Sequence, residues 1–185
     1  MPTSASDPAS RLVNVSPMTQ QHRNLVLMRH AKSAYPDGVA DHDRPLASRG
    51  VREAGLAGDW LRASLPAVDS VLCSTATRAR ETLAHTGIDA PVRYVSRLYG
   101  AVPGTVIEEI DKVADEVRTL LVVGHEPTTS ELAIILAGAD GTDFDAVERI
   151  SAKFPTSAVA VLRVAGRWDQ VGPGDAALVG FHVPR

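Results

Sequence analysis

Cysteine, aromatic residues and long apolar runs are scarce in this 185-residue sequence. The single cysteine, Cys73, excludes an internal disulfide and a cysteine-rich metal cluster, and it suits a reducing compartment. Aromatic residues make up 4% and the formal net charge is -3, which leaves little stacking surface or positive charge for nucleic acid or an anionic membrane. No run approaches the roughly 18 apolar residues of a membrane span, and residues 1–23 lack the apolar segment of a signal peptide. We therefore expect a cytoplasmic protein with no nucleic-acid or membrane partner.

The remaining composition is that of an ordinary globular domain. Apolar residues make up 44% and charged residues 22%, and 185 residues suffice for one full hydrophobic core. Residues 1–23 contain prolines among Ser, Thr, Asn and Gln and offer few side chains that could bury a face. We therefore expect a flexible N-terminal tail over residues 1–23 and a single domain over residues 24–185. Nothing in the pattern indicates an oligomeric state.

Short apolar runs alternate with longer amphipathic stretches along most of the chain. The runs have the length of buried strands, and the stretches have helical spacing and begin near Ser, Thr or Pro. Such alternation predicts an α/β fold, specifically a three-layer α/β/α sandwich around a mostly parallel sheet. We predict strands over residues 25–28, 70–73, 91–95 and 119–123, and helices over about residues 48–65, 75–86, 105–117 and 128–136.

The C-terminal part of the chain departs from this alternation. Residues 146–150 favour a short helix, and residues 156–164 have the β-branched alternation of a strand. The following Gly-Arg-Trp sequence predicts a hairpin into residues 168–171, which would add an antiparallel edge to the sheet. Residues 176–183 are a further candidate to return against the sheet.

Cationic and imidazole side chains follow three of the predicted strands. Arg29 and His30 come directly after the first strand, His125 follows another, and Arg78 comes after a third, near the start of a helix. The carboxyl ends of strands open into the ligand crevice of an α/β sheet, and a helix N-terminus favours an anion. Guanidinium groups grip phosphate oxygens, and a neutral imidazole can attack phosphorus. Two arginines and two histidines without a local carboxylate cluster therefore predict a cage for a dianionic phosphoryl group.

Neighbouring residues have less specific explanations. Lys32 and Ser33 either hold the loop after His30 or bind the phosphoryl group, and the sequence leaves both roles open. The four remaining histidines lie outside this constellation and are expected to be solvated or structural: His22, His42, His85 and His182.

Two other kinds of site can be weighed against the phosphoryl cage. Four residues lie between Cys73 and Arg78, one fewer than in the Cys-x5-Arg loop of tyrosine phosphatases, and the glycines of that loop are missing. A metal site built from His30, His125 and Asp43 would place a cation beside arginines, which would repel it. We therefore expect neither a cysteine nucleophile, nor a metal, nor a cofactor.

Five segments of the chain form an ordered set of motifs. The first is Arg-His-Ala-Lys-Ser at residues 29–33, and the others are, in order, DHDRPLASRG (41–50), STATRARETL (74–83), VVGHEPTTSEL (122–132) and FPTSAVAVL (154–162). This set resembles the histidine phosphatase superfamily, in the form of the small bacterial phosphohistidine phosphatases of the SixA type. The resemblance covers residues 24–185 and implies the histidine phosphatase fold and a metal-independent phosphatase activity.

Residue by residue, the resemblance implies that His30 is the nucleophile and that Arg29, Arg78 and His125 bind the phosphoryl group. Neutral His30 would attack phosphorus in line, while the arginines and a protonated His125 bind the equatorial oxygens. Water would then hydrolyse the phospho-His30 intermediate. Because His30 lies beside cations, we expect it to have a lowered pKa and a backbone carbonyl that holds its other ring nitrogen.

The sequence departs from the wider superfamily at the general acid. In the branch that acts on sugar phosphates, a Glu precedes an Arg-His-Tyr-Gly run, whereas here Ser96 precedes the sequence RLYG of residues 97–100. A phosphohistidine has a labile P–N bond and needs less help from an acid than an alkoxide does. The departure therefore favours phosphohistidine, either in a phosphorylated protein or in a small phosphorylated metabolite.

Two alternatives stay open. A small-molecule phosphoester hydrolase would draw its acid from four candidate carboxyls: Asp37, Asp41, Asp43 and Glu126. A non-catalytic regulatory module would keep the phosphate-binding cage without useful turnover.

Overall fold

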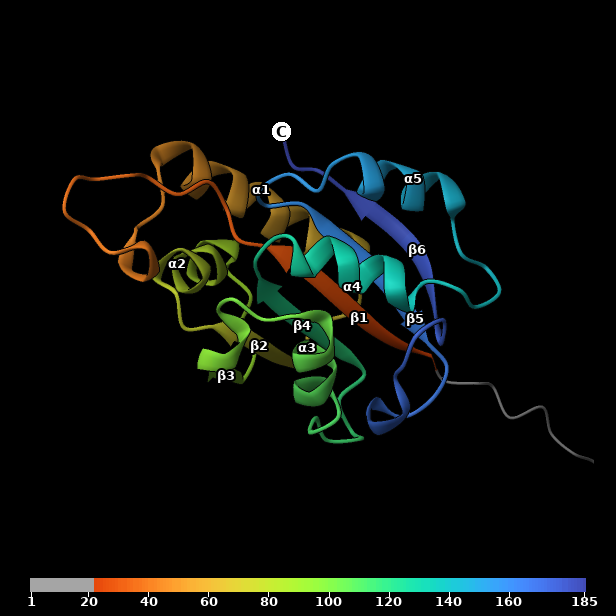
Figure 1. The fold of residues 1–185 in the computed structure, drawn as a ribbon. Helices are drawn as coiled ribbons and strands as arrows, with labels where there is room; N and C mark the ends of the chain where they lie inside the picture. The colour runs from red at the N-terminus through yellow and green to blue at the C-terminus, as the bar shows by residue number, and fades with distance from the viewer. Residues whose placement is uncertain (1–21) are drawn as a thin grey trace, which may run out of the picture.

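A six-stranded sheet in the order β3-β2-β4-β1-β5-β6 runs through the molecule, as seen in a computed structural model that describes residues 22–185 (Figure 1). Four strands are parallel: β1 (Arg23–Arg29), β2 (Ser70–Ser74), β3 (Val92–Val95) and β4 (Thr119–Gly124). Antiparallel pairs link β1 with β5 (Val159–Val164) and β5 with β6 (Ala176–His182). The predicted α/β architecture, with a mostly parallel sheet and an antiparallel edge, is confirmed.

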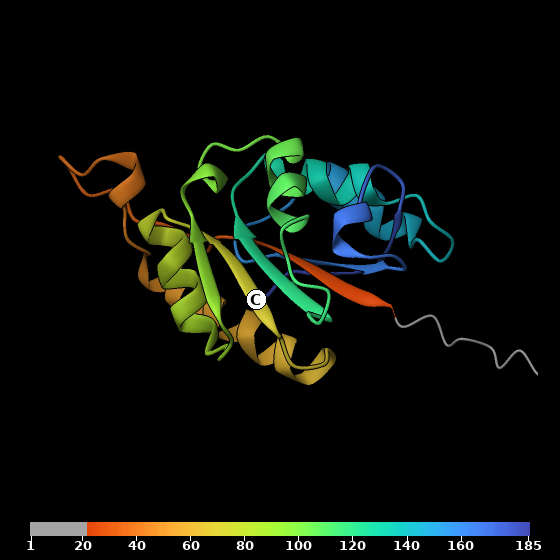
Figure 2. The same ribbon diagram turned by 90° about the horizontal axis from the view of Figure 1, so that it is seen from below.

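Helices cover both faces of the sheet (Figure 2). One face carries α1 (Ser48–Ser64) and α2 (Thr77–Thr86), and the other carries α3 (Pro103–Ile110), α4 (Thr128–Leu136) and α5 (Phe144–Ala152). Alternate side chains of a strand point to opposite faces, so the side chains of β1 contribute to the hydrophobic cores on both faces of the sheet. Leu25 and Leu27 pack under α4, whereas Val26 and Met28 pack on the side of α1 and α2. This burial on both faces explains why β1 reads as a continuous apolar run rather than an alternating one.

The hairpin predicted from residues 156–164 into residues 168–171 is wrong. Trp168 opens a short 3-10 helix, η3 (Trp168–Gln170), and its fully buried indole donates a hydrogen bond to the Val117 carbonyl at 2.9 Å. Burial of this large ring against the core outweighs strand pairing at this point. The partner of β5 is instead β6, the segment that we identify from the sequence as a candidate to return against the sheet.

The helix predicted over residues 105–117 is shorter than expected. It begins earlier, because Pro103 is favourable in the first turn of a helix, and it ends at Ile110. Turns follow, with hydrogen bonds from Val113 to Ile110 and from Val117 to Ala114. Val113 and Val117, which extend the helical spacing in the sequence, still pack against the core, but from these turns.

The tail predicted over residues 1–23 lies almost wholly outside the described residues. Arg23 belongs to β1, is buried, and donates a hydrogen bond to the Gly166 carbonyl at 2.5 Å. Within residues 22–185, none of the helices is long and apolar enough to cross a membrane.

Candidate active site

The carboxyl ends of β1 and β4 lie side by side and bring two of the predicted residues together. Arg29 is paired with Gly124 in the sheet, and the His30 amide donates to the Gly124 carbonyl at 2.9 Å. His125 therefore emerges beside His30, with 5.0 Å between the two ring centroids. Arg78 lies in the first turn of α2, after β2, and its Nε is 3.3 Å from Nε2 of His30. The structure thus brings all four predicted cage residues to one place.

An open pocket of about 340 Å³ lies at these strand ends. Its lining consists of the four cage residues and four neighbours: Arg29, His30, Asp41, Arg78, Tyr99, Gly100, His125 and Glu126. Lys32 and Ser33 are not among them. The Lys32 ammonium lies 5.1 Å from the centre of the Tyr35 ring, and Ser33 is buried in a β-bridge with Leu46. Both therefore hold the loop after His30 in this structure.

The His30 imidazole is held in one orientation and is neutral. Its Nδ1 donates to the Ala31 carbonyl at 2.7 Å, which leaves the Nε2 lone pair facing Arg78. Burial, with a smaller contribution from His125 and the arginines and against the opposing effect of the Ala31 carbonyl, lowers the His30 pKa to about 3. The carbonyl and the lowered pKa agree with the sequence prediction, but burial, more than the nearby cations, is the main cause of the shift. His30 is therefore unprotonated at Nε2 at neutral pH, where this nitrogen accepts a hydrogen bond from Nε of Arg78 at 3.3 Å.

Thr82 of α2 connects the loop after β1 to the backbone of Arg78. Its hydroxyl accepts the Ala31 amide at 2.8 Å and donates to the Arg78 carbonyl at 2.5 Å. The loop and the first turn of α2 are thus fixed relative to each other. The sequence analysis does not single out Thr82, because a Thr inside a helix carries no signal of its partner.

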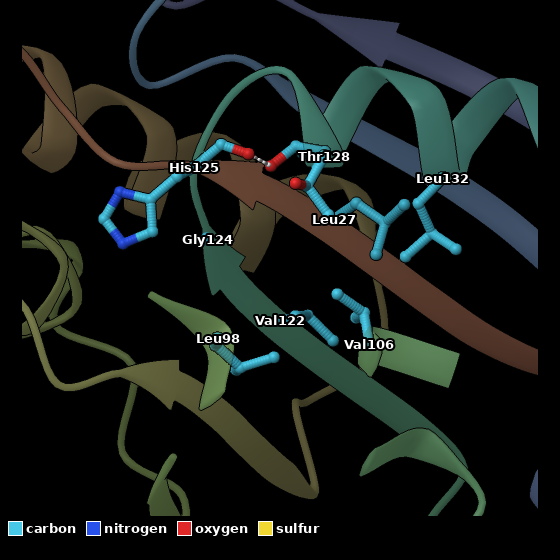
Figure 3. A pocket seen from close by; sticks show the side chains of 9 residues that line it. Leu27, Leu98, Val106, Val122, Gly124, His125, Thr128 and Leu132 are labelled. Atoms are coloured by element: carbon cyan, nitrogen blue, oxygen red, sulfur yellow. Dashed lines mark hydrogen bonds between the residues drawn. The ribbon is translucent and has the colours of Figure 1, made fainter. Parts of the chain in front are cut away.

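His125 is neutral, which corrects the expected protonated form. Burial, with a further contribution from the Arg78 guanidinium, lowers its pKa to about 4. Its Nε2 is 2.8 Å from the hydroxyl of Ser74, and its buried Nδ1 has no hydrogen-bond partner within residues 22–185. His125 is one of the residues that line a small cavity of about 20 Å³, together with Leu27, Val122 and other mainly apolar residues. Figure 3 shows the two ring nitrogens of His125 turned away from these apolar side chains. The ring nitrogens of His125 therefore face away from the apolar core, and Nε2 lies against the Ser74 hydroxyl.

The two arginines are held differently. Arg29 donates from Nη1 to the Phe154 carbonyl at 2.7 Å, and burial lowers its pKa from the usual value for arginine. Arg78 is engaged by Asp41, whose carboxylate accepts from Nη2 at 3.0 Å and whose carbonyl accepts from Nη1 at 2.5 Å. The Tyr99 hydroxyl donates to the same Asp41 oxygen at 2.7 Å. Asp41 therefore accepts hydrogen bonds from both terminal nitrogens of Arg78, the guanidinium fork, at the pocket.

The four candidate acids separate into two groups. Asp41 and Glu126 line the pocket, whereas Asp37 and Asp43 do not. The hydrogen bond from Tyr99, with help from the Arg78 guanidinium, lowers the Asp41 pKa, so this carboxyl is ionised at neutral pH. Burial raises the Glu126 pKa, against two opposing hydrogen bonds from Ser130.

The competing sites considered from the sequence find no support in the geometry. Burial raises the pKa of the Cys73 thiol to about 12, and its Sγ donates to the Ser74 carbonyl. A thiolate nucleophile is therefore unfavourable at this position. In the part of the chain from residue 22 onward, no group of three His, Cys, Asp or Glu side chains is arranged to hold a metal ion.

Tyr99 lines the pocket and Ser74 contacts His125, and neither residue is predicted from the sequence. A signal exists for Ser74, because it directly follows the apolar run of β2, as His125 follows that of β4. Tyr99 follows the short 3-10 helix η2 (Ser96–Leu98) and reaches the pocket across sequence-distant elements. That placement depends on the tertiary fold.

The fold and this site define an α/β protein with a pocket lined by two arginines and two histidines, and comparison with known proteins gives the family. The family model described as histidine phosphatase superfamily (branch 1) matches residues 25–99. A solved structure from Nakamurella multipartitia, provisionally assigned as the phosphohistidine phosphatase SixA, is 42% identical with a TM-score of 0.81, covering 88% of this chain and 96% of its own. Another from Agrobacterium tumefaciens, with the same provisional assignment, is 29% identical with a TM-score of 0.72, covering 88% of this chain and 99% of its own.

Sequence relatives extend the match. An uncharacterized Mycobacterium tuberculosis protein is 79% identical over 158 residues, which span 85% of this chain and 100% of the relative. The chain belongs to the histidine phosphatase superfamily and is of the SixA type. The family and the site mark it as a phosphatase.

Proposed function

We propose that this chain hydrolyses phosphohistidine through a phospho-His30 intermediate. The observation that carries the proposal is the neutral His30 imidazole, whose Nδ1 is tied to the Ala31 carbonyl and whose Nε2 lies against the Arg78 guanidinium. A nucleophile at phosphorus needs an unprotonated nitrogen of this kind, and the surrounding cations match the charge of the phosphoryl oxygens.

The proposed reaction has two displacements at phosphorus. Nε2 of His30 forms a bond to phosphorus as the P–N bond of the substrate breaks, and the substrate imidazole, already protonated on its other ring nitrogen, leaves with the electron pair as a neutral ring. Arg29, Arg78 and His125 bind the equatorial oxygens during this transfer. Water then attacks the phosphorus of phospho-His30, which releases phosphate and restores the neutral ring.

The carboxyls at the pocket support a phosphoramidate substrate. Asp41, the acid nearest to Arg78, is ionised and already accepts hydrogen bonds from Arg78 and Tyr99, so it has no proton to give. An imidazole leaving group tolerates this absence better than an alkoxide does. The open pocket at the strand ends also suits a side chain presented by a phosphorylated protein, with a small phosphorylated metabolite as the other possible form of substrate.

A second candidate, a small-molecule phosphoester hydrolase, is favoured by Glu126. This residue lines the pocket, and burial raises its pKa, which increases the fraction of carboxyl that carries a proton. Two hydrogen bonds from Ser130 hold its carboxyl at the entrance to α4. In an ester hydrolase, Glu126 would protonate the leaving alkoxide.

The two functions can be separated by measuring turnover of phosphohistidine and of an alkyl phosphate ester side by side, with a metal chelator present. We expect P–N cleavage with little ester hydrolysis, no turnover in His30→Ala, and unchanged P–N cleavage in Glu126→Gln. Glu131→Gln is the matched control, since Glu131 is in the first turn of α4 and does not line the pocket. Strong ester hydrolysis that Glu126→Gln removes would select the second candidate, and phosphate binding without turnover would select the regulatory module.

A further inference from the structure

Ser74 is a buried polar residue that the proposed mechanism does not use. It ends β2, is fully buried, and its hydroxyl makes two hydrogen bonds within residues 22–185. One is accepted from the Ala76 amide at 3.3 Å, and the other joins the hydroxyl to Nε2 of His125 at 2.8 Å. The second contact places Ser74 directly behind a residue that lines the pocket.

The direction of the Ser74–His125 hydrogen bond follows from counting protons. His125 is neutral, so one ring nitrogen carries a hydrogen and the other carries a lone pair. If Nε2 donated to Ser74, the buried hydroxyl hydrogen would be left with no acceptor among the described residues. If Ser74 donates to Nε2, its hydroxyl hydrogen and the Nε2 lone pair are both satisfied, while an oxygen lone pair still accepts the Ala76 amide.

The other ring nitrogen of His125 gives an independent observation. His125 is 9% exposed, and its Nδ1 is buried without a hydrogen-bond partner in the described part of the chain. The ring turns its nitrogens away from the apolar cavity, and its centroid is 5.0 Å from that of His30 (Figure 3). Because His125 lines the pocket at the strand ends, an oxyanion bound in that pocket would supply the missing acceptor, provided that Nδ1 carries the hydrogen.

We propose that Ser74 is a positioning residue that holds His125 in the Nδ1–H tautomer, so that this N–H donates to an oxygen of the bound phosphoryl group. The binding half of this inference rests on the proposed function, since it requires an oxyanion in the pocket, whereas the tautomer can be measured without one. A neutral donor fits the site because a second positive imidazole would have to be buried beside Arg78. Ser74 thus selects which nitrogen faces the substrate without touching the substrate itself.

The direct test is the tautomer of His125 in the whole protein, read from long-range ¹H–¹⁵N correlation spectra of the imidazole at neutral pH. We expect a protonated Nδ1 and an unprotonated Nε2 in the unsubstituted protein, and a mixture of both tautomers in Ser74→Ala. Calorimetric titration with inorganic phosphate should show about tenfold weaker binding in Ser74→Ala, with binding restored in Ser74→Thr, which keeps the hydroxyl. Ser70→Ala, at the other end of β2, is the matched control and should change neither measurement.

The tautomer and phosphate-binding measurements test the role of Ser74 independently of whether the protein is a phosphatase. A protonated Nε2 in the unsubstituted protein would overturn it, whether or not Ser74→Ala folds. Unchanged tautomer and phosphate binding in a folded Ser74→Ala would also overturn it. The expected tautomer in a protein that binds phosphate but never releases it from phosphohistidine would uphold Ser74 and reject the phosphatase function instead.

Discussion

The two sides of the pocket are built in different ways. The strand-end side holds Arg29 and His30 by backbone hydrogen bonds, from Arg29 to the Ala158 carbonyl at 3.1 Å and from Ser157 to the His30 carbonyl at 3.2 Å. The loop side is a short 3-10 helix, η1 (Asp41–Asp43), whose Asp41 is held at the pocket chiefly by side-chain contacts with Arg78 and Tyr99. The Asp41 side chain is 56% exposed, while His30 is 8% exposed.

The two sides of the pocket therefore differ in burial and in the kind of contacts that hold their residues. Burial on the strand-end side keeps His30 and His125 neutral and fixes their orientation, as a nucleophile and a hydrogen-bond donor require. The loop side carries the Asp41 carboxylate on the Arg78 guanidinium, where it would compete with the proposed phosphoryl group, and this exposed contact is of the kind that solvent and salt weaken. We therefore expect changes on the strand-end side to affect stability strongly, and changes on the loop side to affect binding modestly.

The largest expected effect is the acid sensitivity of the strand-end side. The pKa of His30 falls from 6.5 to about 3 and that of His125 from 6.5 to about 4 on folding, so between these values the unfolded chain binds more protons than the folded one. Their contribution to stability is complete above pH 6.5 and is lost as the pH falls toward 4. Each histidine should steepen the fall in the free energy of unfolding by up to about 1.4 kcal/mol per pH unit.

Urea unfolding of the unsubstituted protein and of His30→Gln, at steps from pH 7 to pH 4, checks this expectation. His30→Gln should flatten the pH dependence, because it removes one of the two buried groups. Identical slopes in the two proteins would mean that burial of His30 does not control its protonation, and the contrast between the two sides would fail.

The second effect concerns the junction between the two sides, where α1 crosses the loop after His30. A Cβ added to Gly50 would lie 2.1 Å from the Lys32 carbonyl oxygen, which also accepts the Ala47 amide. Gly50→Ala must therefore displace backbone, and we expect it to lower the free energy of unfolding by about 1–3 kcal/mol. Thermal and denaturant unfolding measure this change.

Gly55→Ala in the same helix is the matched control. The nearest atom to its added Cβ is the His85 carbonyl oxygen at 3.9 Å, an ordinary contact. Alanine at this position should stabilise the helix by about 0.5–1 kcal/mol, since glycine loses more backbone entropy on folding. Equal stabilities of the two variants would show that the close approach at Gly50 is not a constraint.

The strand-end side is also the part of the site that sequence predicts well. The apolar run of β1 stops at Arg29 and His30, and the rule that parallel strand ends share one edge is sufficient to bring His125 beside them. That rule does not identify the antiparallel partner of β5. The sequence predicts residues 168–171 as this partner, but Trp168 is buried in a 3-10 helix and β6 pairs with β5 instead. Local patterns determine strand ends, while packing of a distant large side chain determines this edge.

The loop side could be predicted only in part. Asp41 and Glu126 are candidate acids from the sequence, but their opposite pKa shifts come from Tyr99, Arg78 and burial, which only the fold brings together. The role of Ser74 depends on a partner 51 residues away. The sequence shows which residue types follow each strand. It does not show a shifted pKa or a preferred tautomer, because these depend on contacts among residues that are distant in the sequence.

The smallest expected effect lies on the loop side. Asp41→Asn removes the negative charge from the Arg78 fork while keeping a side chain of similar shape, so phosphate meets less competition for the guanidinium. Because the contact is partly exposed, we expect only about a two- to fivefold gain in affinity for inorganic phosphate, measured by calorimetric titration at low salt. Asp43→Asn is the matched control, because Asp43 ends the same 3-10 helix, pairs with His42 and does not line the pocket. Weaker phosphate binding in Asp41→Asn, with Asp43→Asn unchanged, would mean that Asp41 orients Arg78 for phosphate rather than competing with it, and the loop would then share in the chemistry of the strand-end side.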